Sequence, residues 1–397
     1  MNDERGMMNG SRSAALPVRH SAWVVGIDAR AALSPKTGDR TYILNLLRGL
    51  AALKLDAGKW QFQLLLDRPD LEGVLPYSPN FEVVALEAAN SRMWTMRALP
   101  RHARRAGLDL VHLQYLAPLF LSCPYVTAIH DVVWRAMPET FPRLHRAIMN
   151  AQMPRTARRA ARVICGTQSA AQDIEKYLPV RGEKICVTPY SIDPRYYMPV
   201  TAAQIEQVRR KYELGNAPYV LSVGVLQPRK NLPRLIEAFE QCLQTHPDWP
   251  HQLVIVGKKG WGEEQSAIAN PKSKITTTGY VEDEDLPALY AGAACFAYPS
   301  LYEGFGLPII EAMACGAPVL TSHNGAMSEV AGGAAQLADP LSVASIASGL
   351  EAVLGAPERA RQLQQLGKDR AAQFSVEKQA QSTLDVYAQA LIWKPRA

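Results

Sequence analysis

The sequence has no long apolar segment. Its apolar runs fall well short of the roughly 18 uninterrupted residues by which a membrane-spanning helix is recognised. Residues 1–20 are polar, contain Arg5, Arg12 and Arg19, and lack the apolar stretch of a secretory signal peptide. These absences argue against an integral membrane protein and against a secreted one. We therefore predict a disordered leader over residues 1–20 and a protein that stays in the cytoplasm.

Cysteine is scarce, with six residues in a chain of 397. The six are dispersed, and no two are spaced as C-x-x-C, a pattern typical of redox motifs and zinc sites. Most of them lie in apolar segments. This distribution predicts buried free thiols in a reducing compartment. The six residues are Cys123, Cys165, Cys186, Cys242, Cys295 and Cys315.

Signals for a bound cofactor or metal are also lacking. No G-x-G-x-x-G string follows the first predicted strand, so a nucleotide-cofactor dehydrogenase is disfavoured. No histidine cluster has the spacing of metal ligands. We therefore expect neither a cofactor nor a metal ion.

Charge is distributed unevenly along the chain, whose net charge is +6. Residues 1–200 hold 26 Lys/Arg and 17 Asp/Glu, whereas residues 201–397 hold 17 and 20. Two interpretations remain open: solvated helix faces, or a surface for an anionic partner. For the second, the inner face of the cytoplasmic membrane or a lipid pyrophosphate fits better than nucleic acid, because no nucleic-acid-binding motif is present. The clustered arginines are Arg97, Arg101, Arg104, Arg105, Arg143, Arg146, Arg155, Arg158, Arg159 and Arg162.

Short β-branched runs alternate with helical patterns in the first half of the chain. This alternation predicts a mostly parallel sheet with helices on both faces. One of the helical patterns covers residues 170–177, and Ser169 is a candidate cap for it. The predicted strands are 23–27, 62–66, 81–85, 110–113, 125–129, 163–165 and 184–188.

The same alternation restarts after a proline-containing connection near Pro199. We therefore predict an α/β protein of two Rossmann-like, doubly wound parallel-sheet domains that face each other across a cleft, where ligands bind at the carboxyl ends of the strands. The predicted domains are 21–199 and 200–374, followed by a C-terminal helix, 375–397, that packs back on the first. The second set of predicted strands is 219–223, 252–256, 274–277, 294–297 and 318–320.

The strongest motif is a loop that joins a predicted strand to a predicted helix. It places Glu303 and Glu311 eight residues apart, with Gly304 and Gly306 between them. Glycines let backbone amides approach a ligand closely, and a helix N-terminus favours an anion. Two carboxylates beside such a loop suit a ligand rich in hydroxyl groups, because each accepts hydrogen bonds.

The string EGFGLPIIEAMACGAPV from residue 303 closely resembles the E-x7-E signature of retaining GT-B enzymes in glycosyltransferase family 4. This resemblance implies that the first domain binds the acceptor and the second binds a nucleoside-diphosphate sugar. It implies that Glu311 holds the ribose hydroxyls and Glu303 the sugar hydroxyls. The backbone from Gly304 through Phe305 and Gly306 to Leu307 would contact the leaving diphosphate.

A second motif, Val225-Leu-Gln-Pro-Arg229-Lys230, follows the predicted strand 219–223. Two cations on a loop at the carboxyl end of a strand can neutralise a diphosphate. Family members commonly have an arginine directly after Gly224 and a lysine six residues after it. Lys230 is in register, but Val225 occupies the arginine's place, so we predict that Arg229 substitutes for it.

Three further segments match the family. His130 follows the strand 125–129, and in many members this histidine contacts the donor sugar. Asp131 has two open interpretations, orienting His130 or capping the next turn. The loop with Gly38 corresponds to a glycine-rich loop that approaches the donor phosphate or the acceptor. Two interpretations of Asp39 and Arg40 remain open: contact with the acceptor, or a solvated turn. Tyr280 and Val281 correspond to the segment that lies against the nucleobase.

The expected reaction is metal-independent transfer of a hexose, with retention, from a nucleoside-diphosphate sugar to a hydroxyl. The Pro-Arg-Lys-Asn variant resembles mannosyltransferases of bacterial surface polysaccharides such as lipopolysaccharide. This makes GDP-mannose the expected donor and a glycan or lipid-linked oligosaccharide the expected acceptor. Two alternatives remain open, a sugar-nucleotide epimerase on the same fold and a non-catalytic sugar-nucleotide-binding homologue.

Overall fold

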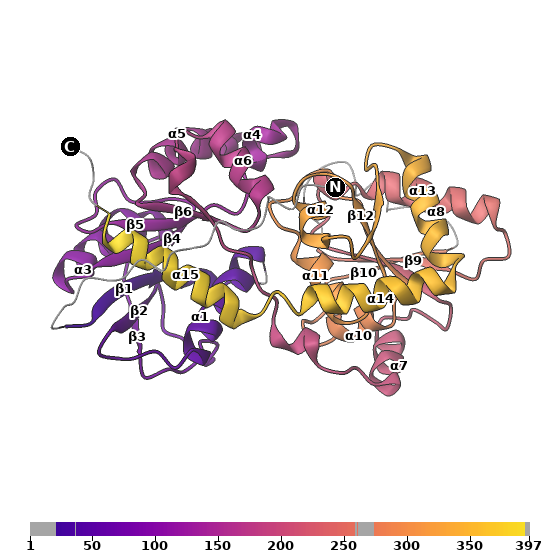
Figure 1. Cartoon of the computed structure of the whole chain (residues 1–397), viewed down its shortest axis with the longest axis horizontal. Coiled ribbons are helices and arrows are strands. Elements are labelled where there is room, and N and C mark those ends of the chain that lie inside the picture. The colour runs from indigo at the N-terminus through magenta and orange to yellow at the C-terminus, as the bar shows by residue number, and fades with distance from the viewer. Residues whose placement is uncertain (1–20, 36, 259, 261–273, 394–397) are drawn as a thin grey trace, which may run out of the picture.

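The computed structural model describes residues 21–35, 37–258, 260 and 274–393. The predicted leader lies outside these residues. The chain forms two parallel sheets that lie side by side along its long axis (Figure 1), as predicted. Within the described residues no helix is long and apolar enough to cross a membrane. All six cysteines are free, as predicted, but only Cys165, Cys242 and Cys295 are buried and the other three are partly exposed.

The first sheet has seven strands in the order β3-β2-β1-β4-β5-β6-β7, all paired in parallel. Its strands are β1 (Trp23–Asp28), β2 (Trp60–Leu66), β3 (Phe81–Ala85), β4 (Leu110–Gln114), β5 (Tyr125–Ala128), β6 (Arg162–Cys165) and β7 (Ile185–Val187). Its α-helices are α1 (Gly38–Ala52), α2 (Ser91–Met93), α3 (Leu99–Arg105), α4 (Val133–Ala136), α5 (Arg143–Arg159) and α6 (Gln168–Tyr177).

The second sheet has six strands in the order β10-β9-β8-β11-β12-β13. Its strands are β8 (Tyr219–Val223), β9 (Gln252–Val256), β10 (Ile275–Gly279), β11 (Cys295–Tyr298), β12 (Val319–Ser322) and β13 (Gln336–Ala338). Within the described residues the remaining α-helices are α7 (Ala202–Lys211), α8 (Leu232–Thr245), α10 (Leu286–Ala291), α11 (Leu307–Ala314), α12 (Gly325–Ala331), α13 (Val343–Leu354), α14 (Pro357–Ala371) and α15 (Val376–Leu391).

The predicted strands all form, but two local predictions need correction. Strand β13, a three-residue strand at the edge of the second sheet, was not predicted. Helix α6 is capped by Thr167, whose hydroxyl accepts a hydrogen bond from the amide of Ala170, and not by Ser169. Thr167 has the extended backbone of a cap, whereas Ser169 already lies within the helix.

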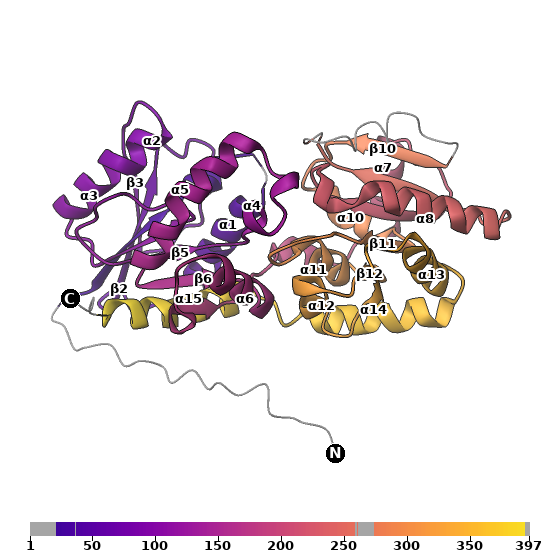
Figure 2. The ribbon, with the colours of Figure 1, turned by 90° about the horizontal axis from the view of Figure 1, so that it is seen from above.

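Helix α15 returns from the second domain and lies along the first (Figures 1 and 2). It packs so closely on α1 that a Cβ atom at Gly49 would lie 2.0 Å from the carbonyl oxygen of Val376. Buried polar groups also join it to the first sheet. Nδ1 of His112 in β4 lies 2.6 Å from the Tyr387 hydroxyl, and its Nε2 lies 3.2 Å from the Tyr42 hydroxyl. These contacts tie α15 to the core of the first domain.

Candidate active site

A cavity of about 430 Å³ lies between the domains, at the carboxyl ends of strands from both sheets. The loops after β1, β5, β8 and β11 all contribute to it, which is where ligands bind in doubly wound folds. Of the predicted site residues, only Arg40 is absent from its wall. Those that line it are Gly38, Asp39, His130, Asp131, Arg229, Lys230, Tyr280, Val281, Glu303, Gly304, Phe305, Gly306, Leu307 and Glu311.

The loop after β11, which contains Gly304 and Gly306, belongs to the second domain and reaches across to contact the first. Glu303 lies on this loop and Glu311 in the second turn of α11, as predicted. A Cβ atom at Gly304 would lie 1.8 Å from the carbonyl oxygen of His130, so only glycine permits this approach. Gly306 has a φ of +96° and is the N-cap of α11, whose N-terminus lies at the cavity wall. A helix N-terminus favours an anion, but Pro308 has no N–H and the amide of Ile309 donates to the carbonyl of Gly306.

Glu303 is the centre of an ion-pair cluster. One carboxylate oxygen accepts hydrogen bonds from Lys230 Nζ at 2.6 Å and from the Tyr298 hydroxyl at 2.8 Å, and the other pairs with Arg229. Burial alone would raise the pKa of Glu303, but the charges of Arg229 and Lys230 outweigh it and lower the pKa to about 2. Burial lowers the pKa of Lys230 to about 8, although Glu303 opposes this. Two cations and one carboxylate leave the cluster with a net charge of about +1.

The side chain of Arg229 lines the cavity from the loop after β8, on which the sequence places this residue. Its Nε donates to Gln227 at 3.1 Å, and its Nη1 donates to the carbonyl of Tyr302 at 3.2 Å as well as pairing with Glu303. Val225, which stands where relatives have arginine, lines the same cavity. The geometry places a guanidinium beside Lys230, because both side chains pair with Glu303. Its role in donor binding stays a prediction.

His130 is held on both ring nitrogens. Nε2 lies 3.0 Å from Gln114 Oε1, and Nδ1 lies 2.8 Å from the Tyr190 hydroxyl. Because an amide oxygen only accepts, Nε2 carries the proton and the Tyr190 hydroxyl donates to Nδ1. Burial lowers the pKa of His130, with Asp39 and Asp131 opposing it. The ring is therefore neutral at neutral pH.

Asp131 caps the turn that leads into the short helix α4, because its Oδ1 accepts a hydrogen bond from the amide of Val133 at 3.1 Å; the N-cap residue of the helix itself is Val132. This is the second of the two predicted interpretations. No hydrogen bond joins its carboxylate to His130 among the described residues. Burial raises the pKa of Asp131, and the charge of Arg229 opposes this.

The loop after β1 separates the two residues for which contact with the acceptor was one interpretation. Asp39 faces the cavity, with Oδ1 3.7 Å from His130 Nε2. Arg40 turns away: its Nε donates to the carbonyl of Ala32 at 3.0 Å, and its Nη1 lies 3.5 Å from Asp283 of the second domain. Arg40 thus forms an ion pair between the domains and lies outside the cavity wall.

The far end of the cavity holds the residues predicted to bind the nucleoside. Tyr280 is partly exposed, with Lys258 Nζ 4.3 Å from its ring centre, and Val281 is buried beside it. Glu311 is 5% exposed and accepts a hydrogen bond from the Tyr290 hydroxyl at 2.9 Å. The cavity thus extends from an apolar and carboxylate-bearing end to the cationic cluster around Glu303.

The residues of the site that were not predicted include Gln114, Tyr115, Tyr190 and Tyr298. Gln114 and Tyr298 each end a strand at the edge of the cleft, and a polar side chain there was the available signal. Tyr115 has a φ of +57°, which is strained for a residue with a side chain. Tyr190 lies in the segment 188–193, whose resemblance to the family's interdomain segment suggests that it shapes the cleft, but its contact with His130, 60 residues away, was not predicted.

An acidic triplet, Asp283-Glu284-Asp285, lies beyond the nucleoside end of the cavity. Its two aspartates are spaced as Asp-x-Asp, and carboxylates are ligands that Mg²⁺ prefers. Asp283 lies 3.5 Å from Arg40, and Asp285 lies 2.6 Å from Lys211. Both carboxylates therefore serve ion pairs in this structure.

Known proteins resemble both halves of the chain. The family model "Glycosyltransferase Family 4" matches residues 37–196, and "Glycosyl transferases group 1" matches residues 204–370. O-antigen chain mannosyltransferase B of Escherichia coli is 32% identical over 266 residues, which cover 66% of this chain and 69% of the relative. The serotype-specific mannosyltransferase WbdA of Escherichia coli is 29% identical over 55% of this chain, but the match spans only 27% of that relative.

Solved structures share the whole architecture. Anabaena HepE in complex with UDP and glucose superposes with a TM-score of 0.69 at 19% identity, covering 92% of this chain and 99% of that one. Three findings agree with each other: the two facing parallel sheets, the two family models, and a relative of which this chain covers more than two thirds. The chain therefore belongs to glycosyltransferase family 4 and has the GT-B fold.

Proposed function

We propose that this glycosyltransferase moves mannose, with retention of configuration, from GDP-mannose to a hydroxyl of a glycan or lipid-linked oligosaccharide in surface-polysaccharide synthesis. The names of its relatives support the sugar: one is an O-antigen chain mannosyltransferase and another a serotype-specific mannosyltransferase. The observation that best supports a transfer reaction is the cationic cluster of Arg229 and Lys230 beside the glycine loop.

In this proposal the leaving diphosphate lies between the two cations and the N-terminus of α11. Charge that develops on it meets preorganised donors, so no metal ion is required. Glu303 is engaged by both cations and by Tyr298, which makes it a poor nucleophile. The acceptor hydroxyl would then attack the sugar on the same face from which the diphosphate leaves, which retains the configuration. The leaving phosphate oxygen would take the proton of that hydroxyl.

A thermal-shift series tests the donor and the metal independence together. GDP and GDP-mannose are expected to raise the melting temperature of the full chain, with and without EDTA, because they bind only the folded state. UDP, ADP and their sugar conjugates should shift it less. A larger shift from another nucleotide would replace GDP-mannose as donor, and a shift abolished by EDTA would contradict metal independence.

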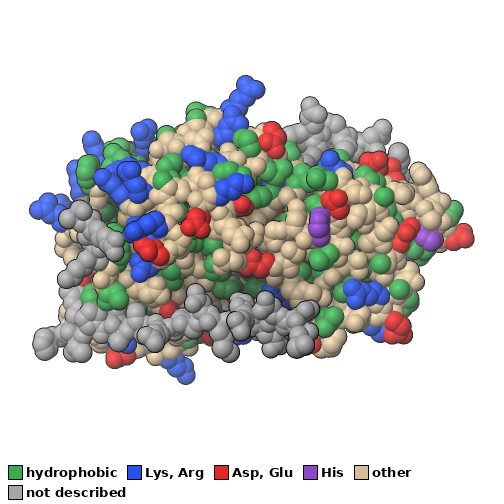
Figure 3. Space-filling model, turned by 45° about the horizontal axis from the view of Figure 1, so that its top comes forward, with side chains coloured by type: hydrophobic (Ala, Val, Ile, Leu, Met, Phe, Trp, Pro, Cys, Tyr) green, Lys and Arg blue, Asp and Glu red, His purple; other side chains and the backbone are tan. Residues whose placement is uncertain are grey.

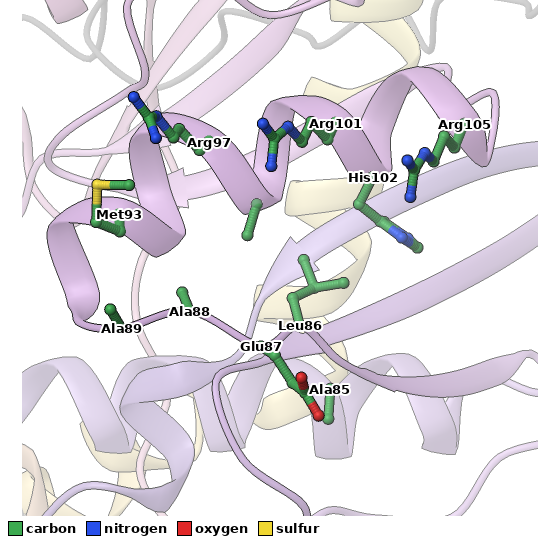
Figure 4. Close-up of a pocket in the computed structure, with 11 residues that line it drawn as sticks. Ala85, Leu86, Glu87, Ala88, Ala89, Met93, Arg97, Arg101, His102 and Arg105 are labelled. Carbon is green, nitrogen blue, oxygen red and sulfur yellow. The ribbon is translucent and has the colours of Figure 1, made fainter.

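We also propose that the first domain contacts an anionic membrane surface. Lys and Arg side chains gather over this domain in Figure 3. A groove of about 410 Å³ runs between α3 and the loop after β3, and Figure 4 shows Arg97, Arg101 and Arg105 spaced along the helix above that loop. All three are exposed, and no ion pair within the described residues engages them. Four-residue spacing places them on one helix face.

Flotation with vesicles tests this contact. Binding to vesicles rich in phosphatidylglycerol should fall as salt rises, because salt screens exposed charges. Replacing Arg97, Arg101 and Arg105 with glutamine should weaken binding about fivefold per residue, given about 1 kcal/mol for each. The matched control neutralises three exposed cations of the second domain, Arg210, Arg361 and Lys368. Equal loss in both variants, or no flotation at low salt, would contradict the proposal.

A further inference from the structure

Helix α6 of the first domain lies against the loop of the second domain that carries Glu303. Figure 2 shows α6 beside α12 where the two domains meet. The hydroxyl of Thr167, at the start of α6, donates a hydrogen bond to the carbonyl of Gly304 at 2.9 Å. The hydroxyl of Tyr302 donates to Oδ2 of Asp173, in α6, at 2.9 Å. Because Tyr302 and Gly304 flank Glu303 in sequence, the first domain holds this loop on both sides of Glu303.

Thr167 links the start of α6 directly to this loop. The residue is 1% exposed, and its hydroxyl oxygen also accepts a hydrogen bond from the amide of Ala170 at 3.0 Å. The same group therefore fixes where α6 begins and where the carbonyl of Gly304 lies. Gly304 is also the residue at which only glycine permits the close approach to His130. The contact of Thr167 thus sets how the loop lies against the first domain.

A carboxylate of the second domain completes the first turn of α6. Oε1 of Glu329, in α12, accepts a hydrogen bond from the amide of Gln168 at 2.7 Å, and its Oε2 accepts from the amide of Ser169 at 2.9 Å. The first N–H groups of a helix have no partner within it, and they attract negative charge. Helix α6 has no acidic residue in its own first turn, so this charge comes from the other domain.

These contacts bear on the reaction because they hold the backbone on either side of Glu303. No residue of α6 lines the central cavity, so within the described part of the chain the helix acts on the site only through this loop. The side chain of Glu303 is held by the cationic cluster of the second domain, whereas its place relative to His130 depends on α6. A misplacement of about 1 Å in an active site can lower a rate about 10²-fold.

We propose that α6 positions the loop of Glu303 for transfer, with Thr167, Asp173 and Glu329 as positioning residues. The inference rests on the proposed transfer from GDP-mannose and assigns a role in it to residues outside the cavity. In this proposal the nucleotide binds to the second domain, and turnover also requires the contacts of α6. Loss of one of these contacts should therefore lower kcat and leave the affinity for GDP unchanged.

A double-mutant cycle tests the contact between Asp173 and Tyr302. The probe reaction is the hydrolysis of saturating GDP-mannose to GDP and mannose by the full chain, with water as the acceptor. Asp173→Ala and Tyr302→Phe should each lower kcat about tenfold, because each removes one charge-assisted hydrogen bond. The double variant should lose no more than either single variant, since both changes remove the same bond. The Kd of GDP should stay within twofold in all three variants.

The variant Glu329→Ala tests the contact with the first turn of α6 and needs no turnover. Glu329 is exposed, so the variant should fold. Backbone amides of this turn and of residues 300–306 should exchange hydrogen for deuterium about fivefold faster than in the wild-type chain, because no carboxylate then holds the helix N-terminus. The matched control is Glu175→Ala, which removes an exposed carboxylate of the same helix that accepts from the amide of Gly182 within the first domain. It should change neither exchange in these segments nor kcat.

Several outcomes would overturn this role of α6. One is exchange over residues 300–306 and a kcat that both stay within twofold of wild type in the Glu329 and Tyr302 variants. Another is a double variant in which the two losses of kcat multiply, since the two residues would then act independently. A loss of GDP affinity equal to the loss of kcat would indicate general damage and would overturn it as well. A chain that binds neither GDP nor GDP-mannose would overturn the proposed function, whereas the exchange measurement would still decide the role of α6.

Discussion

Replacing Lys230 with alanine is expected to weaken the binding of GDP by about 30-fold to 100-fold. The ammonium group makes a charge-assisted contact of the kind worth about 1.5–3 kcal/mol. Its removal also changes the cluster of Arg229, Lys230 and Glu303 from a net charge of about +1 to about zero, so the attraction for a diphosphate falls. Calorimetry with GDP measures the change directly.

The same residue predicts a pH dependence. Burial lowers the pKa of Lys230 to about 8, so the charged form that binds the diphosphate is present below that pH and is lost above it. The affinity of the wild-type protein for GDP should therefore fall by up to tenfold per pH unit above about 8. The alanine variant should lack this dependence. Lys211→Ala, which removes an exposed lysine paired with Asp285, is the matched control and should bind GDP normally.

Two results would contradict this role. One is a folded Lys230→Ala variant whose GDP affinity is within twofold of wild type. The other is a variant that keeps the wild-type pH dependence, since another group would then be titrating. Either outcome would leave Arg229 and the N-terminus of α11 as the diphosphate site.

Much of the fold could be predicted because its signals are local. Apolar runs such as residues 219–223 and 252–256 lie within the strands that form, and the turn after each contains glycine or proline. The same logic placed His130, Lys230 and Glu303 at carboxyl ends of strands, and all three line one cavity. Whether a residue directly follows a strand depends on the nearby sequence, so this placement could be predicted correctly.

The relations between distant side chains could not be predicted in the same way. Nothing near Glu303 indicates that it pairs with a lysine 73 residues away, and nothing near His130 indicates Tyr190 as its partner. Arg40 adjoins Asp39 in sequence, yet pairs with Asp283 across the domains, because the helix directs the two side chains differently. The first two contacts depend on which strands lie close together within one sheet, and only the third depends on how the two domains face each other.

Replacing Glu303 with glutamine is expected to lower kcat/KM by about 10²-fold to 10³-fold, the range for losing one preorganised electrostatic contact in an active site. Glutamine keeps the shape but removes the charge that holds Arg229 and Lys230 together. Both cations are mostly buried, at 19% and 11% side-chain exposure, so the variant leaves two like charges side by side. Removing one partner of a buried pair costs about 3–5 kcal/mol, so the melting temperature should fall.

Measuring the binding of GDP distinguishes a specific loss of turnover in the Glu303→Gln variant from a general loss of ligand binding. At pH 6.5 Lys230 keeps its charge more readily than at higher pH, and the diphosphate can replace the missing counter-charge between the two cations. GDP should therefore bind the glutamine variant at least as tightly as wild type and should raise its melting temperature further, although turnover is lost. Glu358→Gln removes an exposed carboxylate paired with Arg361 on α14 and should change neither quantity. Wild-type turnover in the Glu303→Gln variant, or a loss of GDP affinity equal to that of Lys230→Ala, would show that Glu303 does not act by organising the two cations for transfer.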